Sequence, residues 1–278
     1  MNAPAPLDRR AVESLLSFWA DAGVDAAFED APVNRLAERP VAAPLTARAR
    51  TATGPAPEAA QGFTAHVPAP AAANAIADAR RLAAEAQDLE ALAAAIAAFD
   101  GCPLKFEGAR QAVFARGNPD APVLVIGEAP GAEEDQAGQP FVGRAGKLLD
   151  RMFAAAGLTD RVYITNTVYW RPPGNRTPSP AEQLVCAPFV ERAIALVRPR
   201  MLLLVGGAAA KAVLQRPEGI LSLHGRWFDW RSSDEAQTVP ALPTLHPAFL
   251  LRQPAAKKKA WADLLTLTER LDRPDRPH

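Results

Sequence analysis

The stretch PVLVIG, residues 122–127, is the part of the chain that decides the fold. It is apolar up to its final glycine, and Val123, Val125 and Ile126 are β-branched. A short apolar run of this kind is typical of a strand that is buried on both faces, as in a parallel sheet covered by helices. The sequence therefore predicts a β-strand over these residues.

Three further apolar runs follow, and helical patterns separate them. After the first strand, apolar residues recur at helical spacing from Ala145 to Ala156, and Gly157 closes the pattern. Ser179-Pro180-Ala181-Glu182 has the form of a capping box that begins another helix. The alternation predicts an α/β fold of the three-layer α/β/α type, with a central, mainly parallel four-stranded sheet. The other three predicted strands are VYITNTVYW (162–170), MLLLVGG (201–207) and VPALPTL (239–245).

The first 98 residues differ in composition from the rest, and we interpret them as an N-terminal extension. Apolar residues within 8–22 are spaced for a short amphipathic helix. Residues 40–73 are rich in alanine, proline and threonine, which predicts a flexible linker. The alanine-rich residues 74–98 predict a second helix. We expect the catalytic domain to occupy residues 99–278.

The overall composition indicates a globular protein of the cell interior. Its 278 residues are 49% hydrophobic, which is enough for a packed core. Cys102 and Cys186 are the only cysteines in the sequence. A disulfide framework is therefore not expected, and a reducing compartment is favoured. No run approaches the roughly 20 apolar residues that cross a bilayer. We expect a cytoplasmic monomer that does not bind membranes. The net charge of zero does not by itself indicate a nucleic-acid partner.

The carboxyl ends of the predicted strands are where a site is expected in this type of fold. The first strand leads into Gly127-Glu128-Ala129-Pro130-Gly131, and Glu134 follows closely. Small residues let the backbone approach a ligand, and the carboxylates gather at the mouth of the expected crevice. The spacing matches neither the dinucleotide fingerprint nor the Walker pattern. An acidic, solvated loop would give the same sequence pattern.

Phe141 and Asn166 are candidates for contact with a nucleic-acid base. Phe141 lies between a proline and a glycine in QPFVGR (139–144), where it could present its ring to a base or fill the core beneath the loop. Asn166 follows the core of the second strand. Its amide offers one acceptor and two donors, which suits the edge of a base, but it could equally satisfy neighbouring backbone groups.

The last two strand ends add basic, imidazole and apolar groups. Arg171 and Arg176 lie in the proline-rich loop RPPGNRTP, where they suit contact with phosphate. His246 ends the last strand and could donate a hydrogen bond to a developing oxyanion. The apolar run Phe249-Leu250-Leu251 that follows could wedge into a base stack.

Taken in order, these motifs resemble the family 4 uracil-DNA glycosylases over about residues 99–270. The resemblance implies a hydrolase of base excision repair that binds uracil-containing DNA, flips the uracil out, releases it and leaves an abasic site. The motifs that carry the resemblance are GEAPGAEED (127–135), QPFVG (139–143), YITN (163–166), RPPGNR (171–176), LVGGAAA (204–210) and HPAFLLR (246–252).

The resemblance also implies roles for the charged groups of the site. Breaking the bond between deoxyribose and uracil builds positive charge on the sugar and negative charge on the base. Glu128 or Glu134 would support the sugar cation and position water, and the residues leave open which of the two is essential. His246 would stabilise the uracil anion together with main-chain N–H groups near Ala129.

Recognition roles follow from the same resemblance. Phe141 would stack on the extruded base, and Asn166 would pair with it and reject cytosine. The implied uracil-binding residues are Gly127, Ala129, Phe141 and Asn166. The implied DNA-binding residues are Arg171, Asn175, Arg176, Phe249, Leu250, Leu251 and Arg252.

The cysteines depart from the pattern of this family. Family 4 members typically bind a four-iron, four-sulfur cluster through four cysteines. Cys102 and Cys186 match two of these positions, whereas Phe99 and Trp170 stand at the other two. Because a cluster needs a full set of ligands, the sequence predicts a variant with no iron-sulfur cluster, and hence no cofactor and no metal.

Two other classes of function stay open at this point. One is a non-catalytic protein that binds uracil-containing or single-stranded DNA, although such a protein has no use for the oxyanion donor at His246. The other is a nucleotide-sugar or dinucleotide enzyme on a similar sheet, which lacks its expected glycine fingerprint here.

Overall fold

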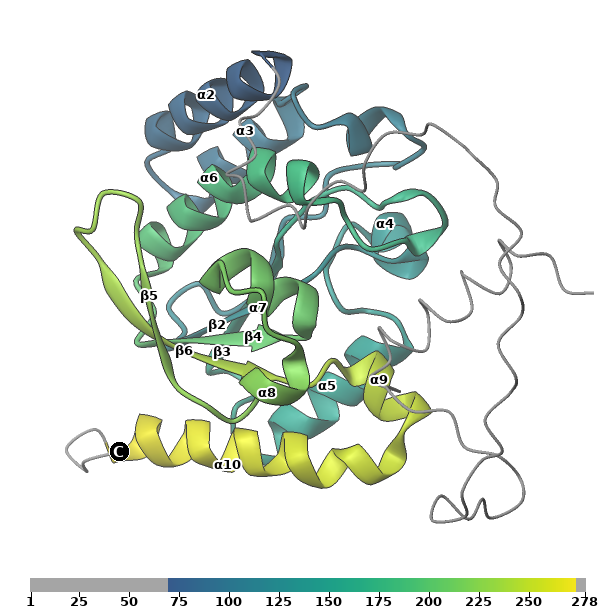
Figure 1. Ribbon diagram of the computed structural model, residues 1–278, viewed down its shortest axis with the longest axis vertical. Coiled ribbons are helices and arrows are strands. Elements are labelled where there is room, and N and C mark those ends of the chain that lie inside the picture. Colours follow the sequence, from purple (N-terminus) through teal and green to yellow (C-terminus); the bar gives the residue numbers. More distant parts are fainter. Residues whose placement is uncertain (1–69, 274–278) are drawn as a thin grey trace, which may run out of the picture. The chain divides into compact units, whose positions relative to one another are not determined.

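The computed structural model describes residues 70–273, with side chains from residue 72 onward (Figure 1). The helix predicted within 8–22 and most of the linker predicted over 40–73 lie outside the described residues. None of the described helices is both long and apolar enough to cross a bilayer.

A six-stranded sheet forms the centre of the structure, in the order β1-β3-β2-β4-β6-β5 (Figure 1). Its four inner strands run parallel and are the four that the sequence predicts, so the α/β fold class is confirmed. Both edge strands are antiparallel, and the prediction of four strands missed them. The inner strands are β2 (Val123–Gly127), β3 (Val162–Asn166), β4 (Met201–Val205) and β6 (Thr238–Thr244), and the edge strands are β1 (Ala115–Gly117) and β5 (Phe228–Arg231).

Helices cover both faces of the sheet, which makes the three layers (Figure 1). Val123 and Val125 point to the face covered by α5 (Arg144–Ala155) and α10 (Lys257–Asp272). Leu124 and Ile126 point to the opposite face, where α6 (Pro180–Val197) and α7 (Gly207–Leu214) pack. This alternation buries every residue of β2, as expected for a central parallel strand. The shorter helices are α4 (Ala132–Ala137), α8 (Ile220–Leu223) and α9 (Pro247–Arg252), with 3₁₀ turns η1 (Pro103–Phe106), η2 (Pro173–Asn175) and η3 (Pro254–Ala256).

Two alanine-rich helices, α2 (Pro70–Glu85) and α3 (Leu89–Ala98), lie against the outer side of α6 (Figure 1). The sequence predicted one helix here, but Asp88 interrupts it, because its carboxylate accepts a hydrogen bond of 2.7 Å from the Ala91 N–H and caps α3. Both helices bury alanine, leucine and isoleucine side chains in the same core as the sheet. They thus belong to the same compact unit as the sheet, and the boundary of the catalytic domain at residue 99 stays a prediction.

The start of α6 shows how local sequence fixes a helix end. The Ser179 hydroxyl accepts a hydrogen bond of 3.3 Å from the Glu182 N–H, and the Glu182 carboxylate accepts one of 2.7 Å from the Ser179 N–H. This reciprocal pair is the capping box that the sequence predicted, and it sets where the loop after β3 joins the helix.

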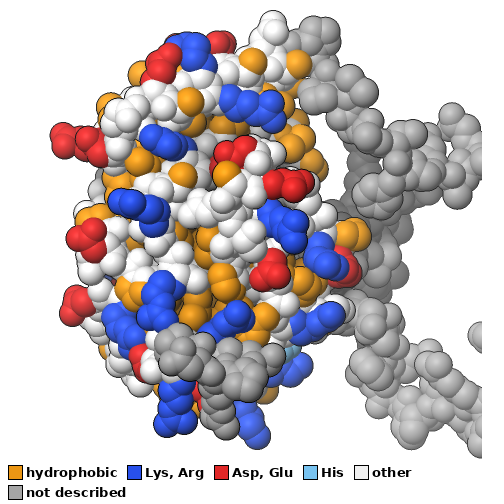
Figure 2. All heavy atoms as spheres, turned by 90° about the vertical axis from the view of Figure 1, so that its left-hand side faces the viewer, with side chains coloured by type: hydrophobic (Ala, Val, Ile, Leu, Met, Phe, Trp, Pro, Cys, Tyr) orange, Lys and Arg blue, Asp and Glu red, His pale blue; other side chains and the backbone are white. Residues whose placement is uncertain are grey.

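The charged surface agrees with the net charge of zero. Figure 2 shows lysine and arginine side chains interspersed with aspartate and glutamate over the upper part of the face that it presents, whereas lysine and arginine predominate in the lower part.

Packing of α5 on the sheet should dominate the stability of this layer. Phe153 of α5 is 2% exposed among Val125, Ile164 and Leu203. Phe153→Ala leaves a cavity, so we expect it to lower the free energy of unfolding by about 3–5 kcal/mol, measured by urea denaturation. Phe106→Ala is the matched control, because Phe106 is 68% exposed and its loss should change stability by less than about 0.5 kcal/mol. Equal losses would contradict this account of the core.

Candidate active site

The carboxyl ends of β2 and β3 bring three of the predicted site residues into contact. Gly127 and Asn166 are partners in the parallel register. A Cβ atom at Gly127 would lie 2.4 Å from Asn166 Oδ1 and 2.5 Å from the ring of Phe141. These separations are far inside van der Waals contact, so glycine is required here by the close approach of two side chains. Gly127, Phe141 and Asn166 therefore line one site.

Phe141 is held in a backbone conformation that a bulky residue rarely adopts. Its φ angle is 55°, in the left-handed region, which costs a non-glycine residue about 1–3 kcal/mol. The Glu134 carboxylate stabilises the turn, because Oε1 accepts hydrogen bonds from the N–H groups of Val142 at 3.0 Å and Gly143 at 2.9 Å. Its Oε2 accepts one of 3.1 Å from the Gly131 N–H. Charge-assisted bonds of this kind are stronger than neutral ones.

These bonds separate the two candidate glutamates. Both oxygens of Glu134 are engaged with backbone N–H groups, so this side chain holds the loop that carries Phe141. Glu128 directly follows β2, and its main-chain oxygen accepts a hydrogen bond of 2.7 Å from the Thr167 hydroxyl. Burial raises the pKa of the Glu128 carboxyl above its usual range, and a hydrogen bond with the Thr177 side chain acts in the opposite direction. Glu128 and Glu134 thus differ in their surroundings, because only the Glu134 carboxylate is bound to the backbone of the turn.

The Asn166 amide is buried without a partner. Asn166 is only 1% exposed, and neither Nδ2 nor Oδ1 has a hydrogen-bond partner in the described part of the chain. Although buried polar groups are usually paired, both ends of this amide are free to bind a group that enters the site. The alternative reading, in which this amide satisfies neighbouring backbone groups, finds no support in the hydrogen bonds of the structure.

His246 lies beside Phe141 as the N-cap of α9. The two ring centroids are 5.8 Å apart, and Gly206 at the end of β4 packs directly against the imidazole. His246 Nδ1 accepts a hydrogen bond of 3.1 Å from the Ala248 N–H, so in the neutral ring the proton is on Nε2. Burial lowers the pKa of His246 to about 4, helped by Arg252 and opposed by Glu134. The site therefore holds a neutral imidazole with one N–H donor.

The loop after β3 is tied together by its own polar groups. Arg176 donates to both carboxylate oxygens of Glu182, at 2.8 and 2.7 Å, and to Glu107 at 3.3 Å. Arg171 donates a hydrogen bond of 2.7 Å to Asn175 Oδ1. These contacts show how the loop keeps its shape, and the predicted contacts of Arg171, Asn175 and Arg176 with DNA stay predictions.

The apolar run after His246 does not present all of its side chains to a partner. Leu250 is 0% exposed and packs with Leu148, Leu245 and Ala260. The prediction that Leu250 contacts DNA is therefore corrected, because its side chain belongs to a small core beneath α9. Phe249 and Leu251 are only partly buried, and Arg252 is exposed. The sequence could not separate these neighbours, because a six-residue helix gives too short a pattern.

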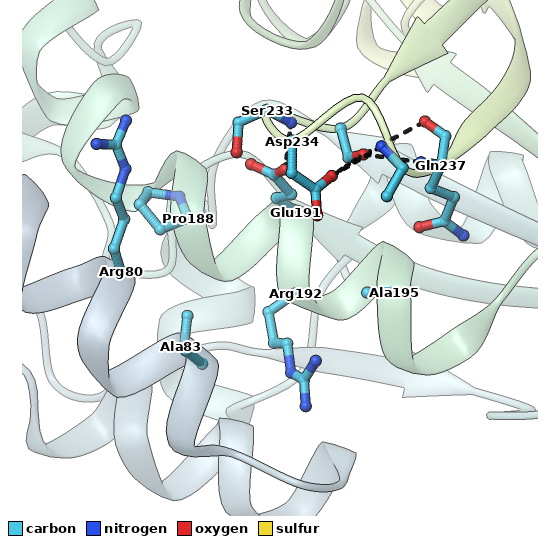
Figure 3. Close-up of a pocket in the computed structure, with 12 residues that line it drawn as sticks. Arg80, Ala83, Pro188, Glu191, Arg192, Ala195, Ser233, Asp234 and Gln237 are labelled. Carbon is cyan, nitrogen blue, oxygen red and sulfur yellow. Dashed lines mark hydrogen bonds between the residues drawn. The ribbon is translucent and has the colours of Figure 1, made fainter.

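A cavity of about 370 Å³ lies away from these residues, between α2, α6 and the hairpin that joins β5 to β6 (Figure 3). In Figure 3, Glu191 points to the hairpin, where its carboxylate accepts a hydrogen bond from the Ser233 N–H. Arg192 donates to the Ala86 carbonyl instead. The polar groups that line the cavity thus hold neighbouring segments of the fold together, so we assign no chemistry to this cavity.

The comparisons with known proteins agree with the geometry. Residues 114–265 match the family model described as the uracil DNA glycosylase superfamily, and the chain belongs to that superfamily. It is similar to the Type-4 uracil-DNA glycosylase of Pyrobaculum aerophilum, with 38% identity over 183 residues that cover 64% of this chain and 91% of that protein. The Type-4 uracil-DNA glycosylase of Thermotoga maritima is 37% identical over 153 residues, covering 54% and 77%. The resemblance drawn from the motifs is thus confirmed.

The comparisons also correct the prediction that the chain has no cofactor. The similar proteins are named Type-4 uracil-DNA glycosylases, and the resemblance to that family implies an iron-sulfur cluster, so the predicted absence does not follow. Cys102 and Cys186 are both buried, with their sulfur atoms 3.9 Å apart. They supply two of the four thiolates that a cluster needs, and in residues 70–273 no group of three or more His, Cys, Asp or Glu could hold a metal ion. The described ligand set by itself does not fit a cluster.

The neutral state of His246 can be tested by NMR. Because the folded pKa of about 4 is below the ordinary value, the imidazole should stay uncharged above about pH 5. A signal absent from His246→Gln should therefore titrate with a midpoint near 4. The unfolded chain binds more protons between these two pKa values, so stability should fall as the pH drops from about 6.5 to 4, more steeply than in His246→Gln. A midpoint near or above 6.5 would contradict the neutral donor.

Proposed function

We propose that this protein hydrolyses the N-glycosidic bond of deoxyuridine in DNA, releasing uracil and leaving an abasic site for repair. The observation that carries the proposal is the buried, unpartnered amide of Asn166 beside Phe141 and His246. Membership of the uracil-DNA glycosylase superfamily and similarity to proteins named as Type-4 uracil-DNA glycosylases support it.

Recognition of uracil rests on the donor and acceptor pattern of the Asn166 amide. Nδ2 can donate to O4 of uracil, and Oδ1 can accept from its N3–H. Cytosine has a donor amine at position 4 and an acceptor at N3, so it would oppose like groups at both points. A buried site that leaves polar groups unpaired discriminates strongly. Phe141, whose ring lies against Gly127, supplies the surface on which the extruded base stacks.

Departure of uracil is assisted by donors near its O2 oxygen. As the glycosidic bond breaks, the bonding electrons stay with the base, and negative charge grows on its ring. The Nε2–H of neutral His246 stabilises this charge by a hydrogen bond, together with main-chain N–H groups near Ala129. A well-placed donor of this kind contributes about 3–4 kcal/mol to the transition state. Because its pKa is lowered, the ring is neutral, so it offers an N–H hydrogen bond and is not an imidazolium acid that could protonate the departing base.

The sugar that loses the base becomes positively charged, and the Glu128 carboxylate stabilises this positive charge. This carboxylate directly follows β2 and is partly buried, which strengthens an electrostatic interaction with the sugar cation. The same group orients the water that attacks the anomeric carbon. Glu134 acts on the site indirectly, through the turn that carries Phe141.

The DNA strand is held by the loops around this site. We assign phosphate contacts to Arg171, Arg176 and Arg252, with Asn175 in the same loop, and the space vacated by the base to Phe249 and Leu251. The protein acts as a cytoplasmic monomer, and its buried, free thiols accord with a reducing compartment.

Excision can be measured directly on an end-labelled oligonucleotide with a single uracil. The full-length protein should release uracil, and alkali should then cut the strand at the abasic site. A protein that only binds uracil-containing DNA would shift the labelled band in a gel and leave the strand resistant to alkali. That result, obtained with correctly folded protein, would overturn the proposed activity and favour the binding alternative.

The Asn166 amide should be essential for this activity. Asn166→Asp places a carboxylate against O4 of uracil and removes a buried donor, so excision should fall by at least about ten- to a hundredfold, with weak action on cytosine gained. Asn118→Asp is the matched control, because Asn118 lies in an exposed turn after β1. Single-turnover rates on uracil and cytosine substrates measure both effects. Unchanged uracil excision by Asn166→Asp would remove the base-reading role.

A further inference from the structure

The turn that carries Phe141 is held on two sides by charged side chains. Glu134 binds the N–H groups that follow Phe141, as described above. On the other side, Arg116 of the edge strand β1 donates from Nε to the Pro140 carbonyl at 2.7 Å. Its Nη2 donates to the Phe141 carbonyl at 3.0 Å. The two carbonyls on this side and the two N–H groups on the other are thus all bound.

The guanidinium of Arg116 is also held by α5, a helix that covers one face of the sheet. Arg116 Nη2 lies 2.7 Å from Asp150 Oδ1 on α5. The Phe141 carbonyl points to the same helix, since a Cβ atom at Gly146 would lie 1.7 Å from it. The fork of Arg116 therefore joins β1, α5 and the turn at a point where the turn packs closely against α5.

We propose that Arg116 is a positioning residue of the active site, which holds the ring of Phe141 in place for the flipped base through the carbonyls of Pro140 and Phe141. The inference rests on the proposed uracil excision and extends it to a residue that touches no substrate. Arginine suits this task because its planar fork can bind several carbonyl oxygens at once, which a lysine ammonium on a flexible stem cannot do with the same geometry.

A purely structural role for the Arg116 ion pair accounts for less of the geometry. The Arg116 side chain is 22% exposed and that of Asp150 is 49% exposed, and exposed ion pairs contribute little to stability. Two of the three hydrogen bonds of Arg116 go to the turn instead of the carboxylate. Without them, the left-handed conformation of Phe141 would be held from one side alone.

The decisive experiment compares three variants of the full-length protein. Arg116→Ala removes the fork, and displacement of a stacking ring by about 1 Å can slow a reaction by up to about a hundredfold. We expect its single-turnover excision rate to fall by between about ten- and a hundredfold, and its inhibition constant for free uracil to rise. Affinity for DNA that already contains an abasic site should stay at the wild-type level, because no base is stacked there.

The two control variants separate positioning from the ion pair and from general stability. Asp150→Asn keeps an acceptor oxygen for Arg116 and removes only the charge, so its rate should fall much less than that of Arg116→Ala. Arg161→Ala removes another arginine that is paired with an aspartate, Asp272 on α10, away from the turn. Its excision rate should match the wild type. Melting temperatures show that all variants are folded at the assay temperature, and Arg116→Lys replaces Arg116→Ala if the latter does not fold.

Amide hydrogen exchange measures how firmly the turn is held, and it does not depend on enzymatic activity. The N–H groups of Val142 and Gly143 should exchange faster in Arg116→Ala than in the wild type or Arg161→Ala. An Arg116→Ala protein with wild-type excision, wild-type inhibition by uracil and unchanged exchange would overturn the proposal, and so would an equal loss of rate in Asp150→Asn. Failure of the wild-type protein to excise uracil would refute the proposed function instead, and exchange would still decide the role of Arg116.

Discussion

The close approach at Gly127 is the constraint on which the site depends. Two side chains, from β3 and from the turn before α5, occupy the space where any other residue would carry a Cβ atom. This contact requires the parallel register that sets Gly127 beside Asn166, and hence the order of the inner strands. The sheet thus does more than supply a core, because its register decides which side chains come together at the site.

Holding that site in shape requires opposing polar contacts around a strained turn. The carboxylate of Glu134 and the guanidinium of Arg116 bind opposite sides of the backbone at Phe141. The Asn166 amide has no hydrogen-bond partner among the described residues. The left-handed backbone at Phe141 lowers the stability of the protein and is the kind of cost that concentrates at functional sites. The rest of the α/β/α core stabilises the fold enough to tolerate this cost.

The sequence predicted those features that depend on local pattern. The apolar run at 122–127 identified the central strand, and the rule that ligands bind at strand ends indicated Asn166 and His246 as site candidates. It could not predict the partners of Glu134 or the burial of Leu250, because both depend on residues distant in the chain. β1 was missed because three residues with mixed exposure carry no periodic signal. Counting cysteines also led to the wrong expectation about a cofactor.

The position of Arg116 on β1 links the chemistry to the margin of the sheet. β1 is three residues long and pairs with β3 alone. Short edge strands of this kind open locally, and the free energy of this local opening is far smaller than the free energy of unfolding the whole protein. On warming, fraying of this edge would release the ring of Phe141 while the inner strands remain intact. Catalytic activity would then be lost in molecules that are still folded.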